Sequence, residues 1–258
     1  MGATPLAGSG VVVLGGSAGV GLESAAQFAE HGARVLLLGR SVERGRAACD
    51  AVRERVPNAD VGFVRADASD TAEAHRAERE CRDRLGAIDT LMCTTGPSEP
   101  PRLLAGVPAE NIEPRITEII LPPLHMMHAV LPAMRERGRG AIVNVASDAA
   151  KVATPGETLI GAAMAAIVMF SKAAALEVKR EGVRINVITP SLIADTPGAA
   201  LIAGEPFSAK MFEKAAAMAH LGVAEAEDLA AMAVFLASPA TRRVTGQTIS
   251  INGGISVA

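Results

Sequence analysis

The chain lacks tyrosine and tryptophan altogether, and aromatic residues make up only 2% of its 258 positions. So few rings leave little surface on which unpaired bases could stack. The formal charge of −3 is spread evenly and forms no basic patch that would meet a phosphate backbone. We therefore exclude nucleic-acid binding. The absence of tyrosine also excludes every mechanism in which a phenol carries the catalytic proton.

Long apolar runs and paired cysteines are missing as well. Although 49% of the residues are apolar, no uninterrupted run reaches the roughly 20 residues of a membrane helix, so we predict no membrane span. Residues 1–10 lack the basic start and apolar stretch of a secretion signal, which predicts a cytoplasmic protein. Cys49, Cys81 and Cys93 have neither CxxC spacing nor a His-rich neighbourhood, so we expect core thiols and no metal site.

Short apolar runs alternate along the chain with longer amphipathic segments. Each run is four to six residues long, as expected for parallel strands that helices cover on both faces. Gly32, Gly86 and Gly182 separate a helical pattern from the next run, where glycine adopts a left-handed helix end at little cost. We predict an α/β fold, one domain over 1–258, with a doubly wound parallel sheet. The expected strands are 11–14, 35–38, 61–64, 88–93, 141–145, 184–188 and 248–251.

A glycine-rich turn follows the first of these strands and leads directly into a helical pattern. Glycines let backbone N–H groups approach a pyrophosphate, and the helix N-terminus adds a favourable dipole. In doubly wound sheets, ligands bind beyond the carboxyl ends of the strands, where this turn lies. The sequence therefore predicts a dinucleotide site formed by Gly15, Ser17, Gly19, Val20 and Gly21.

Three further features carry a resemblance to a known family. The turn has the spacing G-x-x-x-G-x-G, Ser147 follows an apolar strand, and the chain ends with Val-Thr-Gly-Gln at 244–247 and Asn-Gly-Gly at 252–254. In these features the chain resembles the short-chain dehydrogenases/reductases from end to end. The resemblance implies a Rossmann-type domain that binds a nicotinamide dinucleotide and transfers hydride.

The residue after the second strand bears on the choice of cofactor. An acid there would accept hydrogen bonds from the ribose of NAD, whereas a cation would meet the extra phosphate of NADP. The chain has Arg40, so we predict NADP(H) in preference to NAD(H); a merely solvated arginine is the alternative. The resemblance assigns Asp67 to the adenine edge. It also places in the cofactor site Thr94, Gly96, Pro190 and Ile193.

The same resemblance implies that Ser147 polarises the acceptor oxygen, but the proton relay of the family has no counterpart here. The family has Tyr and Lys thirteen and seventeen residues after its serine, where this chain has Ile160 and Met164, and the family's catalytic Asn falls on Ile119. None of these side chains can carry a proton. Other polar residues near the strand ends are candidate replacements, although each is also an ordinary solvated or packed side chain. They are Asp148, Lys151, Glu157, Thr158 and His125.

Two apolar regions bear on substrate and partners. The segment at about 195–220 occupies the place of the family's variable substrate lid, and its apolar content predicts a small apolar substrate or a closed, dry cover. The helix expected over 161–178 is apolar nearly all round and needs burial on more than one side. The resemblance implies that a second subunit covers it, in a homodimer, a homotetramer or a hetero-oligomer with an active paralogue. Burial within one chain is the alternative.

Two functions therefore follow from the sequence. In the first, the chain is an atypical NADP(H)-dependent oxidoreductase that acts on a carbonyl, an imine or a conjugated acceptor without a tyrosine acid. In the second, it is a catalytically silent structural or regulatory subunit that keeps the nucleotide fold. The retained glycines and Arg40 favour the first, and the combined loss of Tyr, Lys and Asn favours the second. We place the oxidoreductase first.

Overall fold

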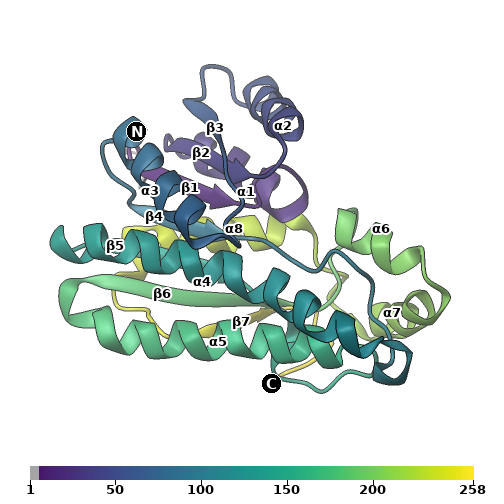
Figure 1. Cartoon of the computed structure of the whole chain (residues 1–258). Coiled ribbons are helices and arrows are strands. Elements are labelled where there is room, and N and C mark those ends of the chain that lie inside the picture. The colour runs from purple at the N-terminus through teal and green to yellow at the C-terminus, as the bar shows by residue number, and fades with distance from the viewer. Residues whose placement is uncertain (1–5) are drawn as a thin grey trace.

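The structure is a computed structural model that describes residues 6–258, and in this range a parallel sheet lies between two layers of helices (Figure 1). Residues 1–5 lie outside this range, and they form half of the stretch 1–10 on which the cytoplasmic prediction is based. The strands are β1 (Gly10–Leu14), β2 (Arg34–Gly39), β3 (Val61–Arg65), β4 (Thr90–Cys93), β5 (Gly140–Val145), β6 (Val183–Pro190) and β7 (Thr248–Ile251).

The sheet confirms the predicted doubly wound topology. All seven predicted strands are present, with ends that move by at most two residues, and every pair is parallel in the order β3-β2-β1-β4-β5-β6-β7. Val12 on β1 pairs with Leu36 on one side and Leu91 on the other. The strand order therefore reverses between β1 and β4, which is where such sheets open a crevice for a ligand.

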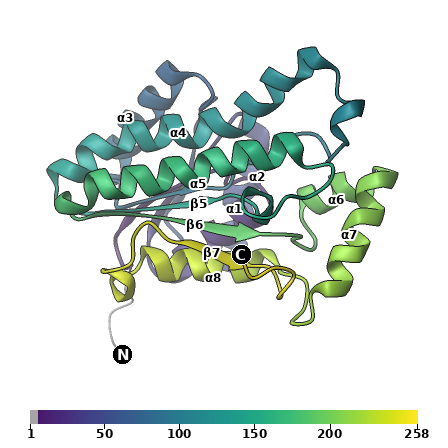
Figure 2. The same cartoon turned by 90° about the horizontal axis from the view of Figure 1, so that it is seen from below.

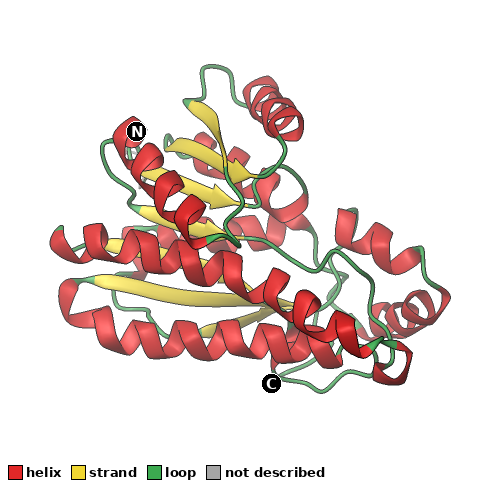
Figure 3. Ribbon diagram, viewed as in Figure 1, coloured by secondary structure: helices red, strands yellow, loops and turns green. Residues whose placement is uncertain are grey.

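Helices cover both faces of the sheet, which forms the middle layer in Figures 2 and 3. Val12 and Leu14 pack beneath α3, α4 and α5, whereas Val11 and Val13 pack beneath α1, α2 and α8. Because successive strand residues point to opposite faces, an unbroken apolar strand supplies both halves of the core. The helices are α1 (Gly19–Glu30), α2 (Val42–Arg55), α3 (Thr71–Leu85), α4 (Ile112–Glu136), α5 (Thr158–Val178), α6 (Pro197–Ala203), α7 (Pro206–Met218) and α8 (Ala226–Ala237).

The three cysteines are buried and free, as the sequence predicted. Burial raises the pKa of the Cys81 thiol to about 12 and also raises the pKa of Cys93. Both thiols therefore stay protonated at neutral pH and act as small apolar side chains.

One helix in the described part of the chain is long and apolar enough to cross a membrane. It spans Thr158–Glu181 and comprises α5 and the turn that follows, with a hydropathy of 1.9 over its most apolar window. Ser171 and Lys172 interrupt its apolar residues, so it does not contain the uninterrupted apolar run by which a membrane helix was defined in the sequence. The helix lies along the sheet beside α4 (Figure 2). Core helices of soluble proteins pass the same test, so this is weak evidence for a membrane span.

Candidate cofactor and substrate site

The glycine-rich turn between β1 and α1 has room for backbone atoms only. A Cβ on Gly21 would lie 2.3 Å from the carbonyl oxygen of Gly15, and a Cβ on Gly15 would lie 2.8 Å from Oγ1 of Thr94. Gly15 also has a φ of +81°, in the left-handed region that glycine tolerates best. Thr94 donates a hydrogen bond to the carbonyl of Leu14 at 2.9 Å, which ties the turn to the end of β4. The turn is therefore a close-packed cradle at the crevice.

A cavity of about 240 Å³ lies on one side of this turn, and it contains Ser17, Arg40, Arg44 and Asp67. Asp67 accepts hydrogen bonds from the backbone N–H (3.1 Å) and the hydroxyl (2.6 Å) of Ser69. These bonds lower the pKa of Asp67, and the positive charge of Arg40 adds to the effect. Arg40 is exposed and forms no ion pair with any residue that the structure describes. Glu118 lines the same cavity and accepts hydrogen bonds from Ser98. The cavity thus combines two carboxyl groups, each hydrogen-bonded to a serine, with two guanidinium groups.

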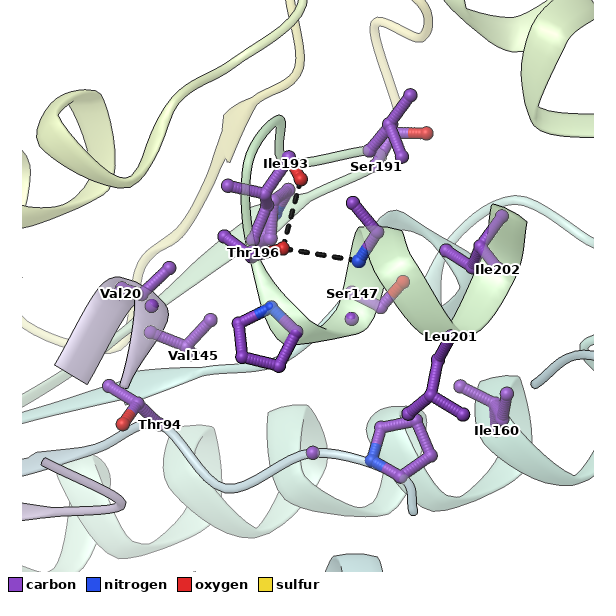
Figure 4. Close-up of a pocket in the computed structure, with 18 of the residues that line it drawn as sticks. Val20, Thr94, Val145, Ser147, Ile160, Ser191, Ile193, Thr196, Leu201 and Ile202 are labelled. Atoms are coloured by element: carbon purple, nitrogen blue, oxygen red, sulfur yellow. Dashed lines mark hydrogen bonds between the residues drawn. The ribbon is translucent and has the colours of Figure 1, made fainter. Parts of the chain in front are cut away.

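A second cavity, of about 340 Å³, adjoins the first at the turn. Both cavities are lined by Gly15, Thr95 and Gly96. The second one also contains Ser147 and five of the residues assigned to the cofactor, namely Gly19, Val20, Thr94, Pro190 and Ile193 (Figure 4). The structure therefore brings the predicted residues together along one crevice, except Gly21, which is buried beneath the turn.

Sequence reasoning missed several polar residues of this crevice, among them Arg44 and Thr95. Arg44 lies in the first turn of α2, and Arg40 lies in the bend before that helix. A second arginine only four residues after Arg40 is a signal that could have identified it. Thr95 lies where the cavities meet, and its buried hydroxyl has no hydrogen-bond partner among the described residues. A buried polar group without a partner costs about 1–3 kcal/mol, so this hydroxyl is available to a ligand. The glycine cradle and the free hydroxyl both fit a bound dinucleotide.

The substrate end of the crevice has the hydroxyls of Ser147 and Ser191 beside an apolar wall. Oγ of Ser147 accepts a hydrogen bond from the backbone N–H of Ala149 at 3.2 Å, so its own hydrogen remains free to donate. Ile160 and Met164 line the same cavity and are only 7% and 4% exposed. Ile119 belongs to the same buried cluster but does not line the cavity.

The segment predicted as a lid forms α6 and α7, which lie beyond the carboxyl ends of the strands (Figure 1). Thr196 caps α6, since its hydroxyl donates to the carbonyl of Ile193 (3.0 Å) and accepts from the N–H of Ala199 (3.2 Å) (Figure 4). Leu201 and Ile202 of α6 line the cavity, together with Phe212 of α7. The lid therefore presents an apolar surface to whatever occupies the substrate end.

Of the five candidate replacements for the missing acid, only Glu157 lines this cavity. Burial raises the pKa of its carboxyl to about 7, and the negative charge of Asp148 acts in the same direction. A carboxyl with a pKa near neutrality can both give and take a proton at physiological pH.

The structure places the other four candidates elsewhere. Asp148 is buried outside the cavity, where it pairs with Lys151 at 3.2 Å and accepts hydrogen bonds from Asn252 and from Ser256 (2.9 Å). Asp148 and Lys151 therefore do not line the cavity, because the two side chains turn from Ser147 toward the C-terminal residues.

His125 and Thr158 are not brought into the cavity either. A ring nitrogen of His125 lies 3.0 Å from the carbonyl oxygen of Ala68, and the other lies 3.2 Å from Oγ1 of Thr71, so His125 joins α4 to the start of α3. Thr158 is exposed at the first position of α5. Their place in the sequence is close to the site, but both side chains point away from the second cavity.

Comparisons with known proteins agree with this architecture. Residues 15–256 match the family described as enoyl-(acyl carrier protein) reductase. The 3-oxoacyl-(acyl-carrier-protein) reductase of Chlamydia pneumoniae is 30% identical over 251 residues, which are 97% of this chain and 98% of that protein.

Two solved structures extend the similarity to three dimensions. Levodione reductase superimposes with a TM-score of 0.89 at 27% identity, over 96% of this chain and 98% of that one. A variant of actinorhodin polyketide ketoreductase, solved with NADPH, gives a TM-score of 0.87 at 26% identity, over 96% and 97% of the two chains. With the parallel sheet, the glycine turn and the position of Ser147, these matches show that the chain belongs to the short-chain dehydrogenase/reductase family of oxidoreductases.

Proposed function

We propose that the chain is an NADP(H)-dependent oxidoreductase that transfers hydride to or from a carbonyl, an imine or a conjugated acceptor in a small apolar substrate. The observation that carries this proposal is that the two cavities adjoin at the glycine turn, where both are lined by Gly15, Thr95 and Gly96. A dinucleotide with its phosphates at the glycine turn would extend from Arg40 at one end to Ser147 at the other. The apolar lid and the wall of Ile160 and Met164 favour an apolar substrate.

The residues of the first cavity suit NADP(H). Arg40 and Arg44 would bind the 2′-phosphate, Asp67 would accept a hydrogen bond from the adenine, and the backbone N–H groups of the turn would meet the pyrophosphate. When bound, the nicotinamide supplies or accepts the hydride. The ketoreductase of similar structure was solved with NADPH, which supports the same choice here.

The chain's own contribution to the reaction is orientation and the exclusion of water. The free hydrogen of the Ser147 hydroxyl would be donated to the acceptor oxygen, and in a dry site such a bond is stronger than in water. By the family resemblance, Ile160, Met164 and Ile119 stand where Tyr, Lys and Asn are expected. The usual relay is therefore replaced by an apolar wall, which makes the site atypical.

The second candidate is a catalytically silent subunit, and the same apolar wall favours it. A silent subunit would bind NADPH in the crevice but would convert no substrate, which distinguishes it from the oxidoreductase.

An exposed apolar face on α5 supports an oligomer in either case. Met169 and Leu176 are 65% and 67% exposed, although the helix as a whole is among the most apolar of the chain. We propose that a second copy of the chain covers this face, in a homodimer or homotetramer. A hetero-oligomer with an active paralogue is the alternative under the silent-subunit hypothesis.

Cofactor titration combined with a substrate panel tests these proposals. We expect the purified protein to bind NADPH at least tenfold more tightly than NADH, because each cation on the phosphate adds about 1.5–3 kcal/mol as a charged hydrogen bond. Arg40→Ala should reduce this preference while leaving NADH binding unchanged. Tighter binding of NADH would overturn the assignment of Arg40. NADPH binding with no turnover of ketones, imines or enones would favour the silent subunit.

A further inference from the structure

Glu157 is an ionisable residue in the part of the crevice that would hold a substrate. Among the described residues, only Glu99 and Glu157 line the second cavity with ionisable side chains. Glu99 pairs with Arg115 at 3.3 Å and is half-exposed. Glu157 forms no ion pair with any described residue. Of the two carboxyls, only Glu157 therefore lacks a neighbouring cation that would stabilise its ionised form.

Backbone contacts hold Glu157 on the same side of the cavity as Ser147. Glu157 lies directly before α5, and its carbonyl accepts a hydrogen bond from the N–H of Gly161 at 2.6 Å. A Cβ on Gly161 would lie 2.7 Å from the carbonyl oxygen of Ala149, which is two residues after Ser147. The first turn of α5 is thus packed against the short 3-10 turn that begins at Ser147.

The lid helix α7 also contacts the residue that precedes Glu157. Gly156 has a φ of +86°, and a Cβ there would lie 2.5 Å from a ring carbon of Phe207 on α7. The aromatic ring therefore packs directly against the residue before Glu157. The α6 and α7 residues that line the cavity are all uncharged, so the lid brings no counter-charge to the carboxyl.

Among the described residues, the Glu157 carboxyl has no cation partner and does not cap α5. Although the residue is at the N-cap position of α5, its side chain makes no capping hydrogen bond. Burial and the negative charge of Asp148 favour the neutral acid, whereas a hydrogen bond with the Thr154 side chain and the helix N-terminus favour the anion. Lys151, the nearest cation in sequence, is paired with Asp148. Burial outweighs the helix dipole, so the carboxyl keeps its proton close to neutral pH.

We propose that Glu157 is the proton donor and acceptor of this site, an inference that rests on the oxidoreductase function proposed above. In the reduction of a ketone, hydride from the reduced nicotinamide forms a C–H bond at the carbonyl carbon, and the π electron pair moves to the oxygen. The oxygen takes the proton of the Glu157 carboxyl, whose O–H bond breaks to leave a carboxylate. Solvent then returns a proton to Glu157. Ser147 donates a hydrogen bond to the same oxygen, and oxidation of the alcohol reverses each step.

The substitution Glu157→Gln tests this role, because glutamine keeps the shape of the side chain and cannot ionise. With a ketone that the wild type reduces, we expect kcat to fall by about 10² to 10⁴, the usual contribution of a general acid. The wild-type rate should decline as the pH rises through about 7, and this decline should be absent in Glu157→Gln. Glu157→Asp, which retains an acid, should recover part of the rate. Glu110→Gln, an exposed change outside the site, is the matched control.

The outcomes separate the two proposals. The dissociation constant of NADPH, measured for every variant, shows whether the crevice is folded, and we expect it to stay within about twofold of the wild type, well under the tenfold that 1.4 kcal/mol produces. A wild type that reduces no member of the panel contradicts the oxidoreductase function. A wild type that turns over, together with a Glu157→Gln variant of similar rate and the same pH profile, overturns the role of Glu157 alone.

Discussion

At the residue scale, close van der Waals contacts fix the conformation of the glycine turn and exclude a side chain at Gly15 and Gly21. We predict that Gly21→Ala weakens NADPH binding by at least tenfold, because a Cβ 2.3 Å from the Gly15 carbonyl forces the cradle open, and overpacking costs about 1–3 kcal/mol. Isothermal titration would measure the change. Gly106→Ala is the control, since a Cβ at Gly106 meets no atom within 4 Å. Equal affinities for both variants would show that the turn does not hold the cofactor.

The ionisation of Glu157 predicts a pH dependence of stability that needs no substrate. Its pKa is about 7 in the fold and about 4.3 in an unfolded chain, so the folded state holds the proton more tightly. The contribution of this tighter proton binding to the free energy of unfolding is fully present below pH ~4.3 and is lost as the pH rises through about 7. Relative to the wild type, Glu157→Gln should therefore gain on the order of 2 kcal/mol in unfolding free energy between pH 5 and pH 8, after allowance for partial exposure. Urea unfolding at both pH values measures this difference, and parallel curves would contradict the raised pKa.

At the scale of elements, Asp148 joins the turn after β5 to the C-terminal residues. It pairs with Lys151 and accepts hydrogen bonds from Asn252 and Ser256 while almost fully buried. We predict that Asp148→Ala lowers the unfolding free energy by about 3–5 kcal/mol, since it leaves the lysine without its partner. Chemical denaturation followed by circular dichroism would measure the loss.

Asp50 provides the matched control for that experiment. It forms an ion pair with Arg53 at the same i,i+3 spacing, but on the exposed surface of α2. Exposed pairs contribute about 0–1 kcal/mol, so Asp50→Ala should have little effect. Equal losses for the two variants would mean that the buried cluster does not anchor the C-terminal residues.

At the scale of the whole molecule, the exposed apolar face of α5 predicts self-association. Charged substitutions there, Met169→Glu combined with Leu176→Glu, should convert the oligomer to a monomer, because burying an unpaired carboxylate at an interface costs several kcal/mol. Light scattering coupled to size-exclusion chromatography gives the mass. The control is Arg79→Glu, a charge change at an exposed position of α3, which should leave the mass unchanged. A monomeric wild type would contradict the proposed oligomer.

The sequence alone determined the sheet, the glycine turn and the apolar replacements at Ile160 and Met164. Short β-branched runs such as 11–14 and 35–38, repeated between helical patterns, favour strands buried on both faces. A glycine turn between strand and helix predicts a dinucleotide site at the carboxyl edge of the sheet. These features are local, so a short window of residues contains the information.

Only the tertiary structure decided which acid faces the cavity. Asp148 and Glu157 are both polar residues close to Ser147 or Ile160 in sequence, yet one points into a buried ionic cluster and the other lines the cavity. Thr95 was likewise recognised only through its unpartnered hydroxyl. Side-chain direction and desolvation depend on residues far away in the chain, such as Asn252 for Asp148 and Phe207 for the residue beside Glu157. No local pattern encodes those distant contacts, which is why the fold could be predicted from the sequence and the proton donor could not.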